Sequence, residues 1–137
     1  MTDRGCASEP DLVSVSLVLP FEWASVARAQ RMIGAMLEAS RLSPDTVADA
    51  RIVLAELAGN AIQHGAPTPE GELEVAWSYG AGPVEVTVHD HGQRVVGASG
   101  EVLSEVGLAR DMTIVGRVCG SWTTDLSDGV RVTALVR

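Results

Sequence analysis

The residue types in this sequence that could do chemistry together are concentrated in residues 54–65, LAELAGNAIQHG. Glu56 and Asn60 stand four residues apart there, and on a helix this spacing places two side chains one above the other on the same face. A glutamate can serve as a general base, and an amide oxygen is a hard ligand suited to Mg²⁺. Asn60 is also the only asparagine of the chain. The pair therefore predicts a helix that forms one wall of a nucleotide site.

The helix that carries this pair is predicted to begin after Ser43 and to run to about His64. Ser43 is a suitable N-cap, and Pro44 follows at the first helical position. At about 100° per residue, one side collects residues expected to pack on a sheet: Val47, Ala50, Leu54, Leu57, Ala58 and Ala61. The opposite side collects a polar stripe: Asp45, Asp49, Glu56, Asn60 and Gln63. Either this stripe lines a site or it is an ordinary solvated helix face, and the pattern alone supports both.

Hydrophobic periodicity predicts the other elements. Alternating apolar residues indicate strands at residues 11–19, 72–79, 84–89, 121–126 and 130–136. Apolar residues at helical spacing indicate helices at residues 21–40 and 107–120, and residues 93–106 are predicted to form a long loop. This order predicts an α+β fold, a two-layer sandwich of helices on a mixed, mostly antiparallel sheet. Residues 1–10 are expected to be a flexible tail and residues 11–137 one domain.

The composition excludes several classes of protein. The chain has 137 residues and a formal net charge of -8, which disfavours binding to a phosphate backbone, so no direct nucleic-acid partner is expected. There is no lysine, so a P-loop, which needs one, is excluded. No apolar run approaches the roughly 20 residues that a membrane helix needs. Residues 1–10 have no apolar core of a signal peptide, so a cytoplasmic location is expected.

The cysteines and histidines do not predict a metal centre. Cys6 and Cys119 are far apart and match no metal or redox spacing. His64, His89 and His91 have no cysteine or second histidine at ligand spacing on a helix, so a zinc site is not expected.

Two short motifs follow the central helix in the chain. Asp90 stands at a predicted strand end with Gly92 beside it, where an aspartate can accept from an adenine amino group and a glycine lets the base approach the backbone. Gly107 and Leu108 open a predicted helix after the long loop, and a helix N-terminus offers unpaired N–H groups to phosphates. Each motif alone is weak evidence for a nucleotide site. The evidence comes from the order and spacing of these motifs after the central helix.

This ordered set resembles the GHKL ATPase superfamily and, within it, the small stand-alone RsbW-like anti-sigma-factor serine/threonine kinases. The resemblance covers residues 11–136. Its most specific part is Glu56-Leu57-x-x-Asn60-Ala61-x-x-His64, which is similar to the N box of that superfamily. The resemblance implies the Bergerat fold of the GHKL ATPases and a site for ATP with Mg²⁺.

The resemblance also implies roles for the two residues of the central pair. Asn60 would coordinate the Mg²⁺ ion that bridges the phosphates. Glu56 would be the catalytic base that activates a serine or threonine hydroxyl on a STAS-type anti-anti-sigma partner. A sigma factor is the other partner implied, and a homodimer is an expected assembly because relatives of this kind often pair.

The remaining nucleotide-binding residues follow from the same resemblance. Asp90 would bind adenine with Gly92 beside it, and Gly107 and Leu108 would end the ATP lid and face the phosphates. In the family a threonine usually comes just after the glycine of the last hairpin. Here that position is not a threonine, and Thr133, which comes later, is the candidate.

Two positions depart from the pattern of the family. The second glycine of its Asp-x-Gly-x-Gly motif is here Arg94, and the first glycine of its Gly-x-Gly-Leu motif is here Glu105. A carboxylate near the phosphates repels them unless it points outward. The sequence thus keeps Glu56 and Asn60, the base and the metal ligand that the resemblance implies, but it departs from the family pattern at two glycines of the lid.

Two functions are compatible with these sequence features. The first is an Mg-ATP-dependent serine/threonine kinase that regulates transcription as an anti-sigma factor. The second is a non-catalytic module of the same fold that sequesters a sigma factor or a STAS protein with weak or no nucleotide binding. A histidine-kinase catalytic domain fits less well, because no helix pair with a phospho-accepting histidine precedes the domain.

Overall fold

A five-stranded antiparallel sheet is the framework of the chain. The computed structural model describes residues 12–80, 82–92, 94–96, 102–105 and 112–137. The strands of this sheet lie in the order β1-β2-β3-β7-β6: β1 (Val13–Pro20), β2 (Glu72–Tyr79), β3 (Val84–Asp90), β7 (Val130–Val136) and β6 (Ser121–Asp125). All four neighbouring pairs are antiparallel, so the predicted α+β fold is confirmed, with no parallel pair in this sheet.

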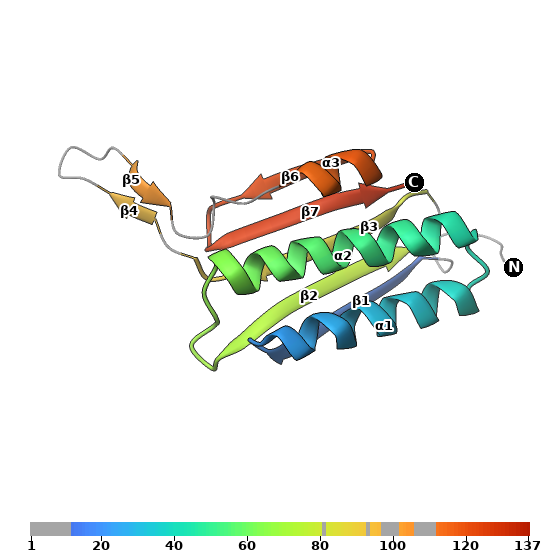
Figure 1. Cartoon of the computed structure of the whole chain (residues 1–137), viewed down its shortest axis with the longest axis horizontal. Helices are drawn as coiled ribbons and strands as arrows, with labels where there is room; N and C mark the ends of the chain where they lie inside the picture. The colour runs from blue at the N-terminus through green and yellow to red at the C-terminus, as the bar shows by residue number, and fades with distance from the viewer. Residues whose placement is uncertain (1–11, 81, 93, 97–101, 106–111) are drawn as a thin grey trace, which may run out of the picture.

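The helices form the second layer. Helices α1 (Trp23–Ala39) and α2 (Pro44–His64) run side by side across one face of the sheet, and the short α3 (Thr113–Val118) packs beside α2 (Figure 1). The predicted tail, residues 1–10, lies outside the described residues. The part of the chain that is described holds no helix with the length and hydropathy needed to cross a membrane.

Strand alternation gives the sheet one dry face and one polar face. In β2 every second side chain is buried, and the same holds for the start of β3 and for β7. The buried members face the helices and are mostly β-branched or aromatic, such as Val75, Trp77, Val86 and Val132. Their neighbours in sequence, such as Ser78, Thr87 and Thr133, lie on the opposite face, which no described helix covers. This polar face of the sheet is therefore open to solvent.

Helix α2 is anchored as the sequence predicts. Ser43 is its N-cap, and the Ser43 Oγ accepts a hydrogen bond from the backbone N–H of Thr46 at 3.1 Å. The residues expected to face the sheet are all buried: Val47, Ala50, Leu54, Leu57, Ala58 and Ala61. The predicted polar stripe is not wholly exposed, because Asn60 retains only 8% of its accessible surface. The start of α3 covers this part of α2, which the helical wheel could not show.

The predicted loop at residues 93–106 contains regular structure instead. Its described part forms the hairpin of β4 (Arg94–Val96) and β5 (Val102–Glu105), a separate two-stranded sheet. Figure 1 shows this hairpin outside the main sheet, beyond the end of β3. Strands of three or four residues are too short to display alternation, so the sequence pattern missed them. The predicted third helix is shorter than expected, since α3 spans Thr113–Val118 and residues 107–111 lie outside the described part.

The Ser43 cap offers a test of how α2 is stabilised. Ser43→Ala removes the acceptor for the Thr46 N–H and should lower the free energy of unfolding by about 1 kcal/mol. Ser43→Gly should lower it by only about 0.3 kcal/mol, because glycine is itself tolerated at an N-cap. Urea unfolding followed by circular dichroism measures both. Two variants as stable as the wild type would show that the cap does not stabilise the helix.

Candidate functional site

The Asp90 carboxyl lies at the end of β3, completely buried. Its Oδ1 accepts a hydrogen bond from the backbone N–H of Gly92 at 2.7 Å. This bond spans two residues and closes a turn of the kind that aspartate side chains commonly form. The carboxyl and the Gly92 backbone are thus held together.

The C-terminal end of α2 packs directly against this carboxyl. A Cβ atom at Gly65 would lie 2.5 Å from both Cγ and Oδ1 of Asp90, so only glycine fits there. The backbone N–H of His91 donates to the carbonyl oxygen of Ala66 at 2.8 Å, which ties the residue after β3 to the segment after α2. Gly65 has a negative φ, so the requirement is for space and not for an unusual backbone angle.

The turn between β6 and β7 packs against the backbone of Asp90. Gly129 has a φ of +70°, and a Cβ atom there would collide with the carbonyl oxygen of Asp90. In the same turn, the backbone N–H of Ser127 donates to Asp125 at 2.9 Å and lowers the pKa of that carboxyl. Three segments far apart in sequence therefore meet at Asp90.

The two polar residues of α2 lie in consecutive turns. Asn60 is buried, and its Nδ2 donates to the Sδ of Met112, 3.8 Å away, at the residue that precedes α3. Glu56 lies one turn nearer the N-terminus of α2 and is half-buried. From Asn60 to Gly65 the helix rises by about 7.5 Å. Glu56, Asn60 and the Asp90 carboxyl therefore follow one another along α2.

Of the three other residues predicted for the site, the described structure places only Thr133. Gly107 and Leu108 lie outside the described residues. Thr133 lies on the polar face of the sheet, where its Oγ1 is 3.1 Å from the Oγ1 of Thr87. The register pairs Asp90 with Val130, three residues before Thr133, and an odd separation on a strand places side chains on opposite faces. Thr133 is therefore separated from Asp90 by the sheet.

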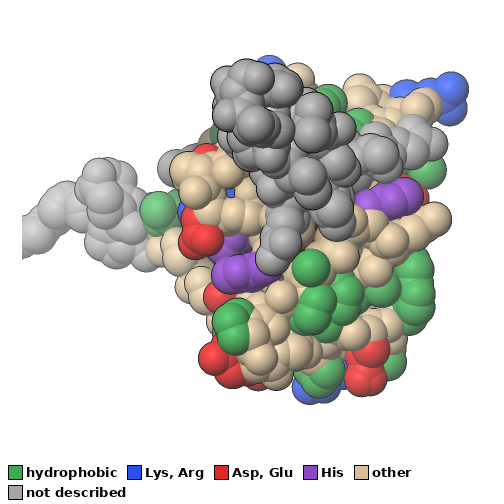
Figure 2. Space-filling view, turned by 90° about the vertical axis from the view of Figure 1, so that its left-hand side faces the viewer, with side chains coloured by type: hydrophobic (Ala, Val, Ile, Leu, Met, Phe, Trp, Pro, Cys, Tyr) green, Lys and Arg blue, Asp and Glu red, His purple; other side chains and the backbone are tan. Residues whose placement is uncertain are grey.

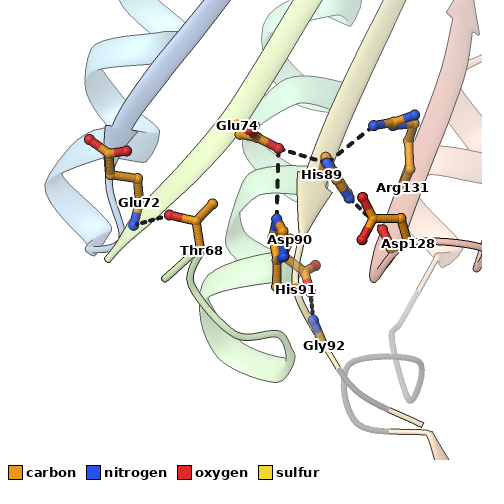
Figure 3. A network of polar contacts seen from close by, with 9 residues as sticks. All are labelled: Thr68, Glu72, Glu74, His89, Asp90, His91, Gly92, Asp128 and Arg131. Atoms are coloured by element: carbon orange, nitrogen blue, oxygen red, sulfur yellow. Dashed lines mark hydrogen bonds and ion pairs between the residues drawn. The ribbon is translucent and has the colours of Figure 1, made fainter. Parts of the chain in front are cut away.

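The structure also gathers a cluster that helical spacing did not predict. Ligand atoms of Glu74, His89 and His91 all lie within 4.8 Å of one another (Figure 3). Figure 2 shows histidine and acidic side chains close together on the end of the molecule that carries the β4–β5 hairpin. The signal in the sequence was the spacing of two between the histidines at a strand end. The pairing of β2 with β3 adds Glu74 as the cross-strand partner of His89.

A comparison with known protein families shows the family of the chain. The model of the family described as "Histidine kinase-like ATPase domain" matches residues 19–111, which hold Glu56, Asn60 and Asp90. The chain belongs to the histidine kinase-like ATPase family. None of the curated proteins matches the sequence.

A solved structure supports the fold of this ATPase-family domain. The crystal structure of the RsbU and RsbW domains of Rv1364c from Mycobacterium tuberculosis matches with a TM-score of 0.70 and 17% sequence identity. The match covers 91% of this chain but 32% of that chain, so the chain spans about a third of the length of that protein. At this identity the likeness shows the fold, which is that of the GHKL ATPases.

Membership of this ATPase family implies ATP binding, usually with Mg²⁺, and the described residues fit such a ligand. A buried carboxyl that can accept from a base lies at one end, with the Gly92 backbone beside it. An amide side chain suited to a hard cation lies on helix α2, at Asn60. The end of β3 and helix α2 thus carry chemically different groups that suit the two ends of a nucleotide.

The contact between Gly65 and Asp90 can be tested by adding one methyl group. Gly65→Ala should lower the free energy of unfolding by about 1–3 kcal/mol, because the new Cβ must displace the Asp90 carboxyl. Gly116→Ala is the matched control, since a Cβ at Gly116 in α3 meets nothing within 4 Å. This control should be neutral or more stable by about 0.5–1 kcal/mol, as expected for alanine in a helix. Equal stabilities of the two variants in urea unfolding would contradict the packing described here.

Proposed function

We propose that the chain is an ATP-binding regulator of the anti-sigma-factor type, with the nucleotide lying along α2. The adenine end lies at Asp90 and Gly92, and the phosphate end lies towards Asn60 and Glu56. The observation that carries this proposal is the buried Asp90 carboxyl, fixed by the Gly92 N–H and given room by Gly65. A position so closely built around one carboxyl is better explained by recognition of a ligand than by packing alone.

The electrostatics of this place favour a ligand that donates a hydrogen bond. Asp90 lies against the C-terminal end of α2, where the helix dipole is negative, so a carboxylate there is not stabilised by the helix. The exocyclic amino group of adenine is a donor and would be stabilised by the carboxylate. Guanine presents an acceptor at the equivalent position, so it would leave the buried carboxylate facing another acceptor. The proposed site therefore selects ATP over GTP.

The residues towards the other end of α2 would serve the phosphates. Asn60 would hold Mg²⁺ through its side-chain oxygen, and Gly107 and Leu108 are expected from the family resemblance to contact the phosphates. Mg-ATP supplies the phosphoryl group. Glu56 would take the proton of a partner serine or threonine hydroxyl as the oxygen of that hydroxyl bonds to the γ-phosphorus and ADP leaves. The half-buried position of Glu56, one turn from Asn60, suits this role.

The proposed partners come from the family resemblance and from the nature of the similar structure. A protein with RsbU and RsbW domains shares this fold, which favours a role among regulators of that kind. We therefore expect a STAS-type anti-anti-sigma protein or a sigma factor as partner, and a homodimer as an expected assembly.

A non-catalytic binding module is the alternative, and the β4–β5 hairpin favours it. Arg94 and Glu105 occupy the positions of two lid glycines, and the register of the hairpin pairs them with each other. Residues in paired strands adopt extended backbone, for which glycine is not required. The glycine-rich loop of the family pattern is thus partly replaced by regular structure, which would weaken the hold of the lid on phosphates.

Titration calorimetry with Mg-ATP tests nucleotide binding. The wild type should bind with a dissociation constant in the micromolar range, and Asn60→Ala should bind at least tenfold more weakly, a loss of about 1.4 kcal/mol. Gln63→Ala is the matched control, since Gln63 is an exposed amide on the same helix and its loss should change nothing. If neither ATP nor ADP binds at millimolar concentration, the proposal fails and the binding module remains.

Transfer of radiolabelled γ-phosphate to a STAS-type partner separates the two functions. Glu56→Ala should retain Mg-ATP affinity but lower the rate of transfer by about 100-fold or more, as expected for loss of a general base. Asp49→Ala removes another carboxylate of the α2 polar stripe and should leave the rate unchanged. Nucleotide binding without any transfer by the wild type would favour the module, and a fully active Glu56→Ala would exclude Glu56 as the base.

A further inference from the structure

We propose that Glu74, His89 and His91 form a binding site for a divalent transition-metal ion of the zinc class. The site lies at the ends of β2 and β3 (Figure 3), and two of its residues, Glu74 and His89, are on the polar face of the sheet. It is separate from the Mg²⁺ ligand proposed at Asn60, and it does not depend on the proposed nucleotide function.

The three ligand atoms are already close to the geometry that such an ion needs. Glu74 and His89 are cross-strand partners, and Oε1 of Glu74 lies 2.7 Å from Nδ1 of His89. The same Oε1 lies 3.9 Å from Nε2 of His91. Ligands of a tetrahedral zinc ion, each about 2.1 Å from the metal, lie about 3.4 Å apart. These two distances lie on either side of this value and all three ligand atoms lie within 4.8 Å of one another, so shifts of about 1.5 Å or less would complete the site.

The donor set and its exposure fit zinc better than magnesium. Two imidazoles and one carboxylate are preferred by zinc and its neighbours in the transition series, whereas Mg²⁺ prefers oxygen ligands alone. The side chains of Glu74 and His91 are 43% and 30% exposed, which leaves an approach from solvent, while His89 is 7% exposed. Three protein ligands would leave the fourth position to a water molecule.

A backbone contact orients the buried histidine as a ligand. The Nε2 of His89 lies 2.5 Å from the carbonyl oxygen of Asp128. A carbonyl can only accept, so Nε2 carries the proton, and in the neutral ring the lone pair is then at Nδ1, directed towards Glu74. A hydrogen bond of this kind, from the second nitrogen of a histidine ligand to a backbone carbonyl, is the usual way in which metal sites fix the ring.

Arg131 is the group that opposes the ion. Its Nη2 lies 3.2 Å from Nδ1 of His89, so its positive charge stands near the position that the metal would take. Arg131 is exposed and borders a shallow hollow of about 320 Å³ on the polar face of the sheet. The side chain therefore has room to swing away when an ion enters. Removal of Arg131 should make metal binding tighter, which no purely structural role of the cluster predicts.

Calorimetry of the untagged full chain with ZnCl₂ tests the proposal, with CoCl₂ absorption as a second readout. The wild type should bind one ion per chain. Because Glu74 and His91 are partly exposed, Glu74→Gln and His91→Ala should fold, and each should bind at least tenfold more weakly. Arg131→Ala should bind several-fold more tightly. His64→Ala, which removes the one histidine outside the cluster, should bind as the wild type does.

The result that would overturn the proposal is equally specific. If the wild type shows no saturable binding of Zn²⁺ or Co²⁺, the cluster is only a histidine–carboxylate ion pair. If Glu74→Gln and His91→Ala retain the wild-type affinity, any bound ion lies elsewhere. Thermal unfolding with and without ZnCl₂ would distinguish the same outcomes, since only an intact site should gain stability from the ion.

Discussion

The buried Asp90 carboxyl is the constraint on which the arrangement of this end of the molecule depends. Burial of a carboxyl group is unfavourable unless hydrogen bonds or charges compensate for the lost water. The Gly92 N–H provides one such bond, and the glycine at position 65 leaves room for the group. The glycine at position 129 leaves room for the backbone carbonyl of the same residue. The end of α2 packs on the side chain of Asp90 and the β6–β7 turn packs on its backbone, so these two segments and the end of β3 meet at a single residue. The residues of a site built from these segments are therefore held in fixed relative positions.

Helix α2 connects this junction to the rest of the site. Its apolar face is buried on the sheet, which fixes the rotation of the helix about its axis. That rotation places Asn60 at the start of α3 and Glu56 one turn away. The packing of the core therefore also positions Glu56 and Asn60, because the helix cannot bury its apolar side without directing these two side chains to one place.

The parts of the fold that local pattern determines were predictable from the sequence. The bounds of β2 and the Ser43 cap follow from alternation and capping chemistry, and both are confirmed. The burial of Asn60 was not predictable, because it arises from contact with a residue 52 positions later in the chain. Thr133 was assigned from its place after a hairpin, and only the register shows that it faces away from Asp90. The histidine cluster likewise depends on which strand pairs with which. Local signals therefore gave the elements, while the relations between distant segments needed the structure.

The central claim, that a nucleotide lies along α2 between Asp90 and Asn60, is tested most directly by ¹H–¹⁵N NMR. Asn60 is the only asparagine, so its side-chain amide gives a signal that is assigned by its absence in Asn60→Ala. On titration with Mg-ATP, this signal and the backbone amides of Gly65 and Gly92 should shift and saturate together. The amide of Gly82, in the turn at the far end of β2 and β3, should not move. Unchanged signals at Asn60, Gly65 and Gly92 in millimolar Mg-ATP would contradict the account.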